Sequence, residues 1–169
     1  MIIGDGDVAK ALSELIVDKD FLFFASGVSN SKELRESEYQ REKDLLLSQD
    51  ENKHIVYFSS LSIFYANGRY QQHKLEMERI IKNTFYRYTI IRIGNISWGS
   101  NPNTIINFFK NKIKNNEPFE IQDTFRHIID KKEFLYWISM IPSWSCEMNC
   151  PGRMLTVKKI VKNIRIGLF

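Results

Sequence analysis

The chain has 169 residues, of which 43% are hydrophobic and 26% charged, and its formal net charge is +4. This size and composition indicate one globular domain with a sizeable core, and no apolar run approaches the roughly 18 to 20 residues that cross a bilayer. The basic residues are scattered, which argues against nucleic acid as a partner and favours a phosphate-bearing small molecule. Because the N-terminus has no basic flank before a long apolar core, we expect a cytoplasmic protein without membrane insertion.

The first 99 residues alternate short apolar runs with longer amphipathic segments. Their periodicity predicts strands at residues 1–4, 21–27, 54–60 and 88–94, and helices at residues 7–17, 31–50 and 70–85. Strands that alternate with helices of such lengths are typical of a parallel sheet built from βαβ units. The predicted fold is therefore α/β, a Rossmann-like parallel sheet flanked by helices.

The pattern is less regular after residue 99. It predicts a helix at residues 103–116, a short strand at 118–122, a helix at 131–141 and a final helix with Thr156 as its N-cap. We interpret the chain as a single domain, with a nucleotide-binding core at residues 1–99 and a small substrate-side cap at residues 100–169. Cys146 and Cys150 lack the ligand spacing of a zinc site, so we expect no metal and two reduced structural thiols.

A G-x-G-x-x-A motif, Gly4-Asp5-Gly6-Asp7-Val8-Ala9, lies between the first predicted strand and helix. In this context the first glycine permits a tight turn, the second lets the backbone approach a pyrophosphate, and the small Ala9 allows close packing. The free N–H groups of the helix N-terminus favour an anion at the same place. Asp5 and Asp7 add negative charge there, although Asp7 alternatively caps the helix. The motif therefore predicts a nucleotide cradle, with a purely structural turn as the alternative.

Tyr70 and Lys74 are four residues apart, so they share one face of a predicted helix. The strand before them ends in Ser59-Ser60, at the sheet edge where parallel folds bind their ligands. A nearby ammonium lowers the pKa of a tyrosine and makes it a usable acid or base. A serine at the strand end can hydrogen-bond the same substrate hydroxyl. The conjunction predicts an acid–base site.

A second Tyr-x-x-x-Lys pattern, Tyr39 and Lys43, lies inside a charged helix with no strand just before it. We expect this pair to be exposed to solvent, and we expect His73 to be exposed rather than catalytic. Three tryptophans are interpreted as packing residues of the core or the cap, namely Trp98, Trp137 and Trp144.

The order of these motifs resembles that of the short-chain dehydrogenase/reductase superfamily, in particular its extended branch of NAD(P)-dependent sugar-nucleotide epimerases and dehydratases. The resemblance rests on the glycine motif, the strand that ends in serines, and a Tyr-x-x-x-Lys-x-x-x-Glu segment that ends at Glu78. It continues in IIRIGNISWG and FRHIIDKKEFLYWI, where the matching residues are Arg92, Asn95, Gly99, Arg126, Asp130 and Glu133. The resemblance covers nearly the whole chain in abbreviated form.

The resemblance implies a role for each matching residue of the catalytic and cofactor sites. Tyr70 would be the catalytic acid or base, with Ser60 or Ser62 beside it. Lys74 would hold the nicotinamide ribose and lower the pKa of Tyr70. The cofactor would be NAD or NADP, and the residues that the resemblance places around it are Gly4, Gly6, Asp7, Val8, Ala25, Ser26, Gly27 and Lys74.

The resemblance also implies a substrate and an assembly. Asn95 and Arg126 would contact the diphosphate side of a nucleotide-linked sugar, and the reaction would be hydride transfer between a sugar carbon and the nicotinamide. Surface polysaccharide biosynthesis would be the setting. The predicted helices at 31–50 and 70–85 would form the interface of a homodimer.

Departures from the family's pattern keep a second hypothesis open. The family's second and third strands, with the acid that binds the adenosine ribose, have no equivalent between residues 17 and 21, so we expect a sheet reduced in strand number. Counting back from Tyr65, the catalytic hydroxyl position falls on Leu61, between two serines. The chain is also far shorter than an ordinary extended member. It is therefore either an NAD(P)-dependent enzyme or a catalytically degenerate Rossmann-fold module for binding or assembly.

Overall fold

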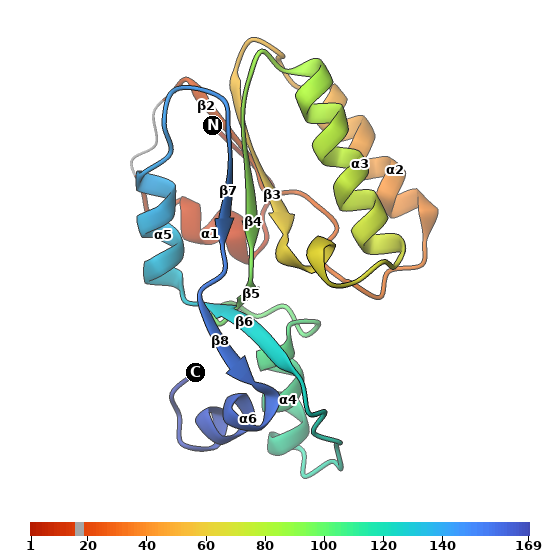
Figure 1. Cartoon of the computed structure of the whole chain (residues 1–169), viewed down its shortest axis with the longest axis vertical. Coiled ribbons are helices and arrows are strands. Elements are labelled where there is room, and N and C mark those ends of the chain that lie inside the picture. Colours follow the sequence, from red (N-terminus) through yellow and green to blue (C-terminus); the bar gives the residue numbers. More distant parts are fainter. Residues whose placement is uncertain (16–18) are drawn as a thin grey trace.

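The computed structural model describes residues 1–15 and 19–169. A five-stranded parallel sheet lies at the centre of the larger part of the molecule (Figure 1), with strand order β1, β2, β3, β4, β7. The strands are β1 (Ile2–Ile3), β2 (Phe21–Phe24), β3 (His54–Ser60), β4 (Arg87–Ile93) and β7 (Cys146–Cys150). Each neighbouring pair is parallel, so the carboxyl ends of the strands share one edge. The predicted Rossmann-like α/β fold is confirmed, and β1 is an edge strand of the described sheet.

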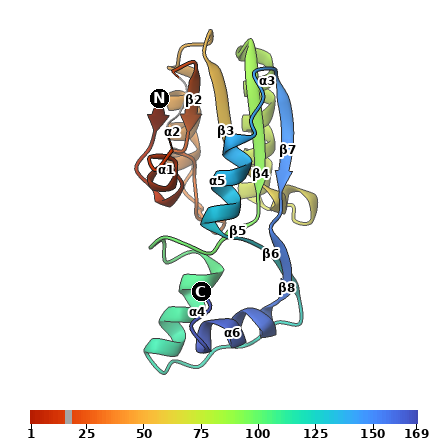
Figure 2. The same ribbon diagram turned by 90° about the vertical axis from the view of Figure 1, so that its left-hand side faces the viewer.

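Helices cover both faces of this sheet because its strands are apolar on both sides. One face carries α2 (Glu36–Leu47) and α3 (Arg69–Thr84), and the other carries α1 (Asp7–Leu12) and α5 (Lys131–Ser139) (Figure 2). The side chains of β3 alternate accordingly. Ile55 and Tyr57 pack into the core beneath α2 and α3, whereas Val56 and Phe58 pack into the core beneath α1 and α5.

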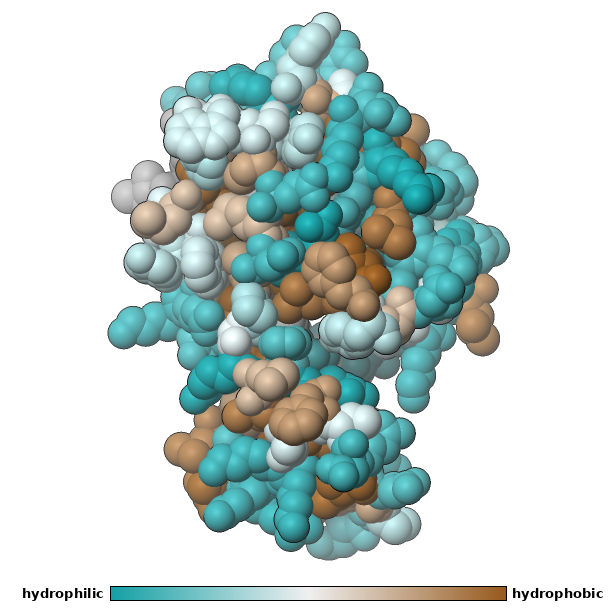
Figure 3. All heavy atoms as spheres, in the orientation of Figure 1, coloured by the Kyte–Doolittle hydropathy of each residue, from teal (hydrophilic) through white to brown (hydrophobic). Residues whose placement is uncertain are grey.

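A smaller subdomain lies beyond the carboxyl edge of the sheet, and the space-filling view shows a narrower waist between the two parts (Figure 3). It contains a three-stranded sheet in the order β5, β6, β8, with β5 parallel and β8 antiparallel to β6. Its elements are β5 (Asn95–Ile96), β6 (Phe125–Ile129), β8 (Arg153–Thr156), α4 (Ile105–Lys114) and α6 (Val157–Arg165). Ile106, Ile128 and Ile160 form one of its small cores, so the subdomain has apolar packing of its own.

Four of the five strands predicted from the sequence are confirmed, and a helix lies within each of the six predicted helical segments. α6 begins after Thr156, whose Oγ1 accepts a hydrogen bond from the Lys159 N–H at 3.1 Å, as expected of an N-cap. α2 begins at Glu36 instead of residue 31, and α1 ends at Leu12. The predicted end of the first helix, at residues 16 and 17, lies outside the described residues.

The strand predicted at residues 118–122 is wrong. The segment is a loop whose Phe119 packs edge-on against Phe109 of α4 at 5.3 Å, so its apolar signal comes from an anchoring side chain. The pattern predicts none of the strands β5, β6, β7 and β8. β7 is the edge strand opposite β1 in the main sheet. Its Glu147 and Asn149 are exposed, and this alternation of polar residues is also typical of a loop.

The second half of the chain is not confined to the small subdomain. α5 packs on the main sheet and β7 pairs with β4, so residues 131–150 return to the larger part of the molecule. The expected division at residue 99 therefore differs from the arrangement in the structure. Among the described residues, no helix has both the length and the apolar character that a membrane span requires.

Several single-residue expectations are wrong because α2 and α3 pack against each other. Tyr39 and His73 are both 0% exposed, and their rings lie 4.7 Å apart between the two helices. Lys43 pairs with Glu76 of α3 at 2.5 Å. A separate expectation is also wrong: Trp144, between α5 and β7, is 68% exposed and does not have the packing role expected of it.

The remaining packing expectations are confirmed. Trp98 and Trp137 pack against the core beneath α1 and α5. Cys146 and Cys150 are free thiols, and burial raises the pKa of Cys150 to about 12, which suits an unreactive structural residue.

Candidate active site

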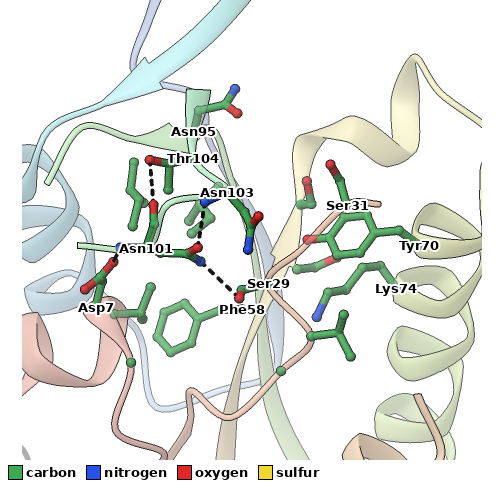
Figure 4. A pocket seen from close by; sticks show the side chains of 18 of the residues that line it. Asp7, Ser29, Ser31, Phe58, Tyr70, Lys74, Asn95, Asn101, Asn103 and Thr104 are labelled. Carbon is green, nitrogen blue, oxygen red and sulfur yellow. Dashed lines mark hydrogen bonds between the residues drawn. The ribbon is translucent and has the colours of Figure 1, made fainter. Parts of the chain in front are cut away.

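A cavity of about 1010 Å³ lies at the carboxyl edge of the main sheet and extends to the small subdomain (Figure 4). Its walls bring together the residues that the sequence singled out at four separate strand ends. They are Gly6, Asp7, Val8, Ala25, Ser26, Gly27, Ser60, Ser62, Tyr70, Lys74, Asn95 and Arg126. Gly4 lies outside the lining. The fold therefore places twelve predicted site residues around one space.

The first two glycines of the N-terminal motif have different surroundings. Gly4 has φ +117°, and a Cβ on it would lie 2.5 Å from the carbonyl oxygen of Ala25, so only glycine lets this turn pack against the end of β2. Gly6 is the N-cap of α1. A Cβ on Gly6 would meet no heavy atom of the described chain within 4 Å, so this side of the backbone faces the open cavity.

Asp7 connects the glycine motif to a distant loop. Its carboxylate accepts hydrogen bonds from the backbone N–H groups of Ser100 (3.0 Å) and Asn101 (2.9 Å). Asn101 in turn donates from Nδ2 to Ser29 Oγ at 3.1 Å, so the loop bridges the β1–α1 and β2–α2 connections (Figure 4). Because Gly6 is the N-cap, the alternative that Asp7 caps α1 is wrong.

Tyr70 and Lys74 project from α3 into the cavity (Figure 4). Lys74 Nζ lies 5.7 Å from the centroid of the Tyr70 ring. The polar contacts of this ammonium are with other residues: it donates to Glu42 Oε1 at 3.0 Å and to the Tyr57 hydroxyl at 2.9 Å. Lys74 is only 2% exposed, so it belongs to the cavity wall and to the buried layer behind it.

Glu42 is the centre of that buried layer and was not singled out in the sequence. Burial by itself raises the pKa of its carboxyl, but Lys74, His73 and the Val28 N–H outweigh burial and hold the pKa well below its usual range. The pKa of Tyr57 is raised well above its usual value by burial and by Glu42. The carboxylate is therefore an anion that its neighbours hold in place.

The serines at the end of β3 form a hydrogen-bonded pair. Ser60 Oγ lies 2.9 Å from Ser62 Oγ and also accepts from the Ser62 N–H at 3.1 Å. Gln71 of α3 donates to Ser62 Oγ at 3.1 Å. Leu61, which occupies the position expected to carry a hydroxyl, is 7% exposed. Both serines line the cavity, so two hydroxyls flank the buried leucine.

Asn95 and Arg126 lie on the subdomain side of the cavity. Asn95 Nδ2 donates to the His127 carbonyl at 3.0 Å, which links β5 to β6. Arg126 Nη1 donates to Thr124 Oγ1 (3.0 Å) and to the carbonyl of Phe125 (2.8 Å). Neither residue has a carboxylate partner among those recorded for the described chain, so the Arg126 guanidinium stands at the cavity as a cation.

Further cavity residues were not predicted from the sequence. The polar and aromatic ones include Lys10 of α1, Arg41 of α2, Tyr65, Gln71, and Asn101, Asn103 and Thr104 of the loop before α4. The loop gave one usable signal, since asparagines and a proline crowd residues 101–103 just after the fourth predicted strand. Arg41 gave none, because it is one of several charged residues on its helix.

The fold is similar to those of several solved structures. The Bordetella bronchiseptica enzyme WbmG in complex with NAD has a TM-score of 0.68 at 12% identity, over 88% of this chain and 56% of that chain. The UDP-N-acetylglucosamine 4-epimerase from Methanobrevibacter ruminantium in complex with UDP-N-acetylmuramic acid has a TM-score of 0.65 at 19% identity, over 97% of this chain and 64% of that chain. The capsular polysaccharide assembling protein CapF from Staphylococcus aureus has a TM-score of 0.60 at 20% identity, over 86% and 45%.

At these identities the likeness shows the fold, and the chain spans about half to two thirds of the length of the three proteins. The chain matches no protein-family model. It also matches no curated protein sequence.

Proposed function

We propose that the chain is an NAD(P)-dependent enzyme of the epimerase, dehydratase or reductase kind, which acts on a nucleotide-linked sugar by hydride transfer. The observation that carries this proposal is the cavity of about 1010 Å³ that unites the glycine motif, the serine pair, Tyr70 and Lys74. Ligands of open parallel sheets bind at this edge. NAD in the B. bronchiseptica enzyme and a nucleotide-linked sugar in the M. ruminantium epimerase support the same assignment for this chain.

The residues present fit a dinucleotide at its pyrophosphate. Gly6 leaves open space beside the start of α1, and Ala25 to Gly27 form the adjacent wall. The adenosine end lacks the contact that the resembled family makes there. In that family a further strand carries an acid for the adenosine ribose, but β1 is an edge strand of the described sheet and no such strand lies beside it. Arg41 lines the cavity and donates to the Ser26 carbonyl at 3.2 Å, so it offers a positive charge beside the β2–α2 wall.

Tyr70 is the proposed acid or base of the reaction. Its side chain reaches the cavity and can exchange a proton with a substrate hydroxyl there, which typically contributes about 10²- to 10⁴-fold to a rate. Ser60 and Ser62 offer the hydroxyls that would orient the same substrate group. A bound nicotinamide would supply the acceptor and donor of the hydride. Lys74 would hold its ribose from the floor of the cavity.

The subdomain side of the cavity is the proposed site of the nucleotide-linked sugar. Arg126 supplies a positive charge for a diphosphate, and Asn95 lies beside it in the lining. The proposal places the chain in surface polysaccharide biosynthesis, which the name of the S. aureus relative in fold supports.

The second candidate is a catalytically degenerate module that retains the fold for binding or assembly. It is favoured by the buried Leu61 at the expected hydroxyl position and by the engagement of Lys74 with Glu42. The two candidates differ in turnover and share the expectation that the cavity binds a ligand.

Calorimetric titration with NAD⁺, NADH, NADP⁺ and NADPH tests the proposal. We expect saturable binding of one cofactor pair, and absence of heat at millimolar cofactor would contradict the enzyme. Tyr70→Phe should retain cofactor affinity within about threefold while turnover of a nucleotide-linked sugar falls by about 10²-fold or more. Equal turnover in that variant would remove Tyr70 from the mechanism.

We also propose that the chain forms a homodimer through α2 and α3. The outward positions of these helices carry polar residues such as Gln40, Asp44 and Gln72, together with Leu47 (53% exposed) and Leu75 (36% exposed). Size-exclusion chromatography with light scattering should give about twice the 20.0 kDa chain mass, and a monomer at all concentrations would contradict the proposal.

A further inference from the structure

Glu42 is buried on α2 at the meeting point of three other elements. Its Oε1 accepts hydrogen bonds from the Tyr57 hydroxyl of β3 (2.7 Å) and from Lys74 Nζ of α3 (3.0 Å). Its Oε2 accepts from the Val28 N–H of the β2–α2 loop (2.6 Å) and from His73 Nε2 of α3 (2.9 Å). A carboxylate with four donors at these distances is held in one position.

Glu42 touches the cavity only through its partners. Lys74, Gly27 and Val28 line the cavity, whereas Glu42 and His73 lie behind them, each 0% exposed. The ion pair of Lys74 and Glu42 is packed directly under the β2–α2 loop. A Cβ on Gly27 of this loop would lie 2.8 Å from Lys74 Nζ and 2.9 Å from Glu42 Oε1. A side chain at this position would therefore push against both charged groups, and glycine lets the loop rest directly on the ion pair.

We propose that Glu42 is a positioning residue, which fixes the Lys74 ammonium beneath Gly27 and Val28 and so couples the catalytic face of α3 to the β2–α2 wall of the cavity. The inference rests on the proposed function for what Lys74 would hold, but the position of Lys74 is testable without any cofactor. Because Lys74 is buried, its ammonium requires a partner that compensates its charge. Without Glu42, the remaining polar contact of Lys74 recorded in the described chain is the neutral Tyr57 hydroxyl.

His73 also holds the Glu42 carboxylate, through one ring nitrogen. Its Nε2 donates to Glu42, while its Nδ1 is buried with no hydrogen-bond partner among the described residues. The ring packs against Tyr39, which is itself fixed by a hydrogen bond from its hydroxyl to the Glu33 carbonyl at 2.8 Å. The imidazole that holds the Glu42 carboxylate is therefore outside the cavity lining, whereas two other donors to that carboxylate, Lys74 and Val28, line the cavity.

A matched control exists on the same helical layer. Glu78 is 3% exposed and accepts from Ser59 Oγ (2.6 Å) and from Arg92 Nε (2.9 Å). It is a buried, ion-paired glutamate like Glu42, but it has no contact with Lys74 or with the β2–α2 loop among those recorded. Glu78→Gln therefore shows how much Lys74 labelling and cofactor affinity change when a buried ion pair that does not hold Lys74 is disturbed.

The first test measures the exposure of Lys74 by reductive methylation and peptide mass spectrometry, with Glu42→Gln, Glu78→Gln and the unaltered protein. We expect Lys74 to be modified at least fivefold faster in Glu42→Gln, with no change in Glu78→Gln. Unchanged labelling in Glu42→Gln overturns the proposal, and so does an equal increase in both variants. Gly27→Ala should also increase the labelling, because its Cβ displaces the pair without altering its charge; this variant decides the matter if Glu42→Gln does not fold.

The second test measures cofactor affinity by calorimetry in the same proteins. We expect the dissociation constant to rise at least tenfold in Glu42→Gln and to stay within threefold in Glu78→Gln. If the unaltered protein binds no cofactor, the proposed function fails while the labelling result still decides the position of Lys74. If the unaltered protein binds and Glu42→Gln binds equally well, the coupling to the cavity is refuted.

Discussion

Two buried glutamates on neighbouring helices, Glu42 and Glu78, each pair with a cation, but the two ion pairs connect different regions of the molecule. Both carboxylates lie almost entirely out of water and both accept hydrogen bonds from a cation and from a hydroxyl. Glu78 holds Arg92 of β4, which also pairs with Glu147 of β7, so this cluster ties α3 to the sheet. Glu42 holds Lys74 and the backbone of the β2–α2 loop, so its cluster reaches the cavity.

The comparison shows that burial of a charge does not by itself mark a functional site. The Glu78 cluster has a second carboxylate in Glu147, and its Arg92 pairs along the edge of the sheet. The Glu42 cluster has a single cation and a single carboxylate, with His73 at one side. The two clusters differ in how they reach the cavity. Two partners of Glu42, Lys74 of α3 and Val28 of the β2–α2 loop, line it, whereas Ser59 is the one hydrogen-bond donor to Glu78 that does so among the described residues.

The largest expected effect is on folding stability when either carboxylate is removed. Glu42→Leu should lower the free energy of unfolding by about 3–5 kcal/mol, the usual consequence of leaving a buried charge without its partner. Glu78→Leu should cost less, because Arg92 retains Glu147. Urea denaturation of the two variants measures the difference. A greater loss of unfolding free energy in Glu78→Leu than in Glu42→Leu would contradict this prediction.

The next effect concerns the coupling between Glu42 and Lys74. Glu42→Gln and Lys74→Met each leave a polar or charged group without its partner, whereas the double variant removes both charges together. The double variant should therefore lose less stability than the sum of the single variants, with an interaction energy of about 1–3 kcal/mol. A double-mutant cycle by urea denaturation gives this number. Additive losses would mean that the 3.0 Å contact contributes no specific energy.

The pH dependence of stability should separate Glu42 from exposed carboxylates. Its pKa in the folded state lies below the value of about 4.3 in an unfolded chain. The folded protein therefore binds fewer protons than the unfolded chain below that value, so stability is lost as the pH falls from about 4.3 toward the folded-state pKa. This group contributes a slope of at most about 1.4 kcal/mol per pH unit. In Glu42→Gln the acid limb of stability should be shallower; an unchanged slope, measured by denaturation between pH 3 and pH 6, would contradict the assignment.

The sequence predicts the α/β fold and the cavity well because both follow from local patterns. Apolar strands such as His54–Ser60 and the glycine motif are recognisable over a few residues, and the parallel order then brings their ends together. β7 could not be found this way. Its polar residues Glu147 and Asn149 are exposed because it is an edge strand, a fact that depends on the whole sheet.

The layer behind the cavity depends on contacts between helices, which explains why Glu42 and His73 were missed. A pattern of charged residues on a helix does not reveal which of them faces a neighbouring helix. One signal was available: Tyr39, Glu42 and Leu46 recur at helical spacing and share one face. A glutamate between two apolar residues on one face predicts a buried charge, which then requires a partner. That partner is Lys74, which lies 32 residues further along the chain, so the local pattern around Glu42 does not reveal it.

The smallest expected effect is at a partly exposed ion pair, Lys43–Glu76, that joins the same two helices as the Glu42–Lys74 pair. Lys43 and Glu76 also join α2 to α3, at 2.5 Å, but their side chains are 18% and 44% exposed. Because water screens such a pair, Glu76→Gln should cost no more than about 1 kcal/mol, and cofactor affinity and Lys74 labelling should stay unchanged. Denaturation and labelling of this variant test whether burial, and not simply a bridge between the helices, gives Glu42 its effect. A loss as large as that of Glu42→Gln would locate the coupling in the helix pair as a whole.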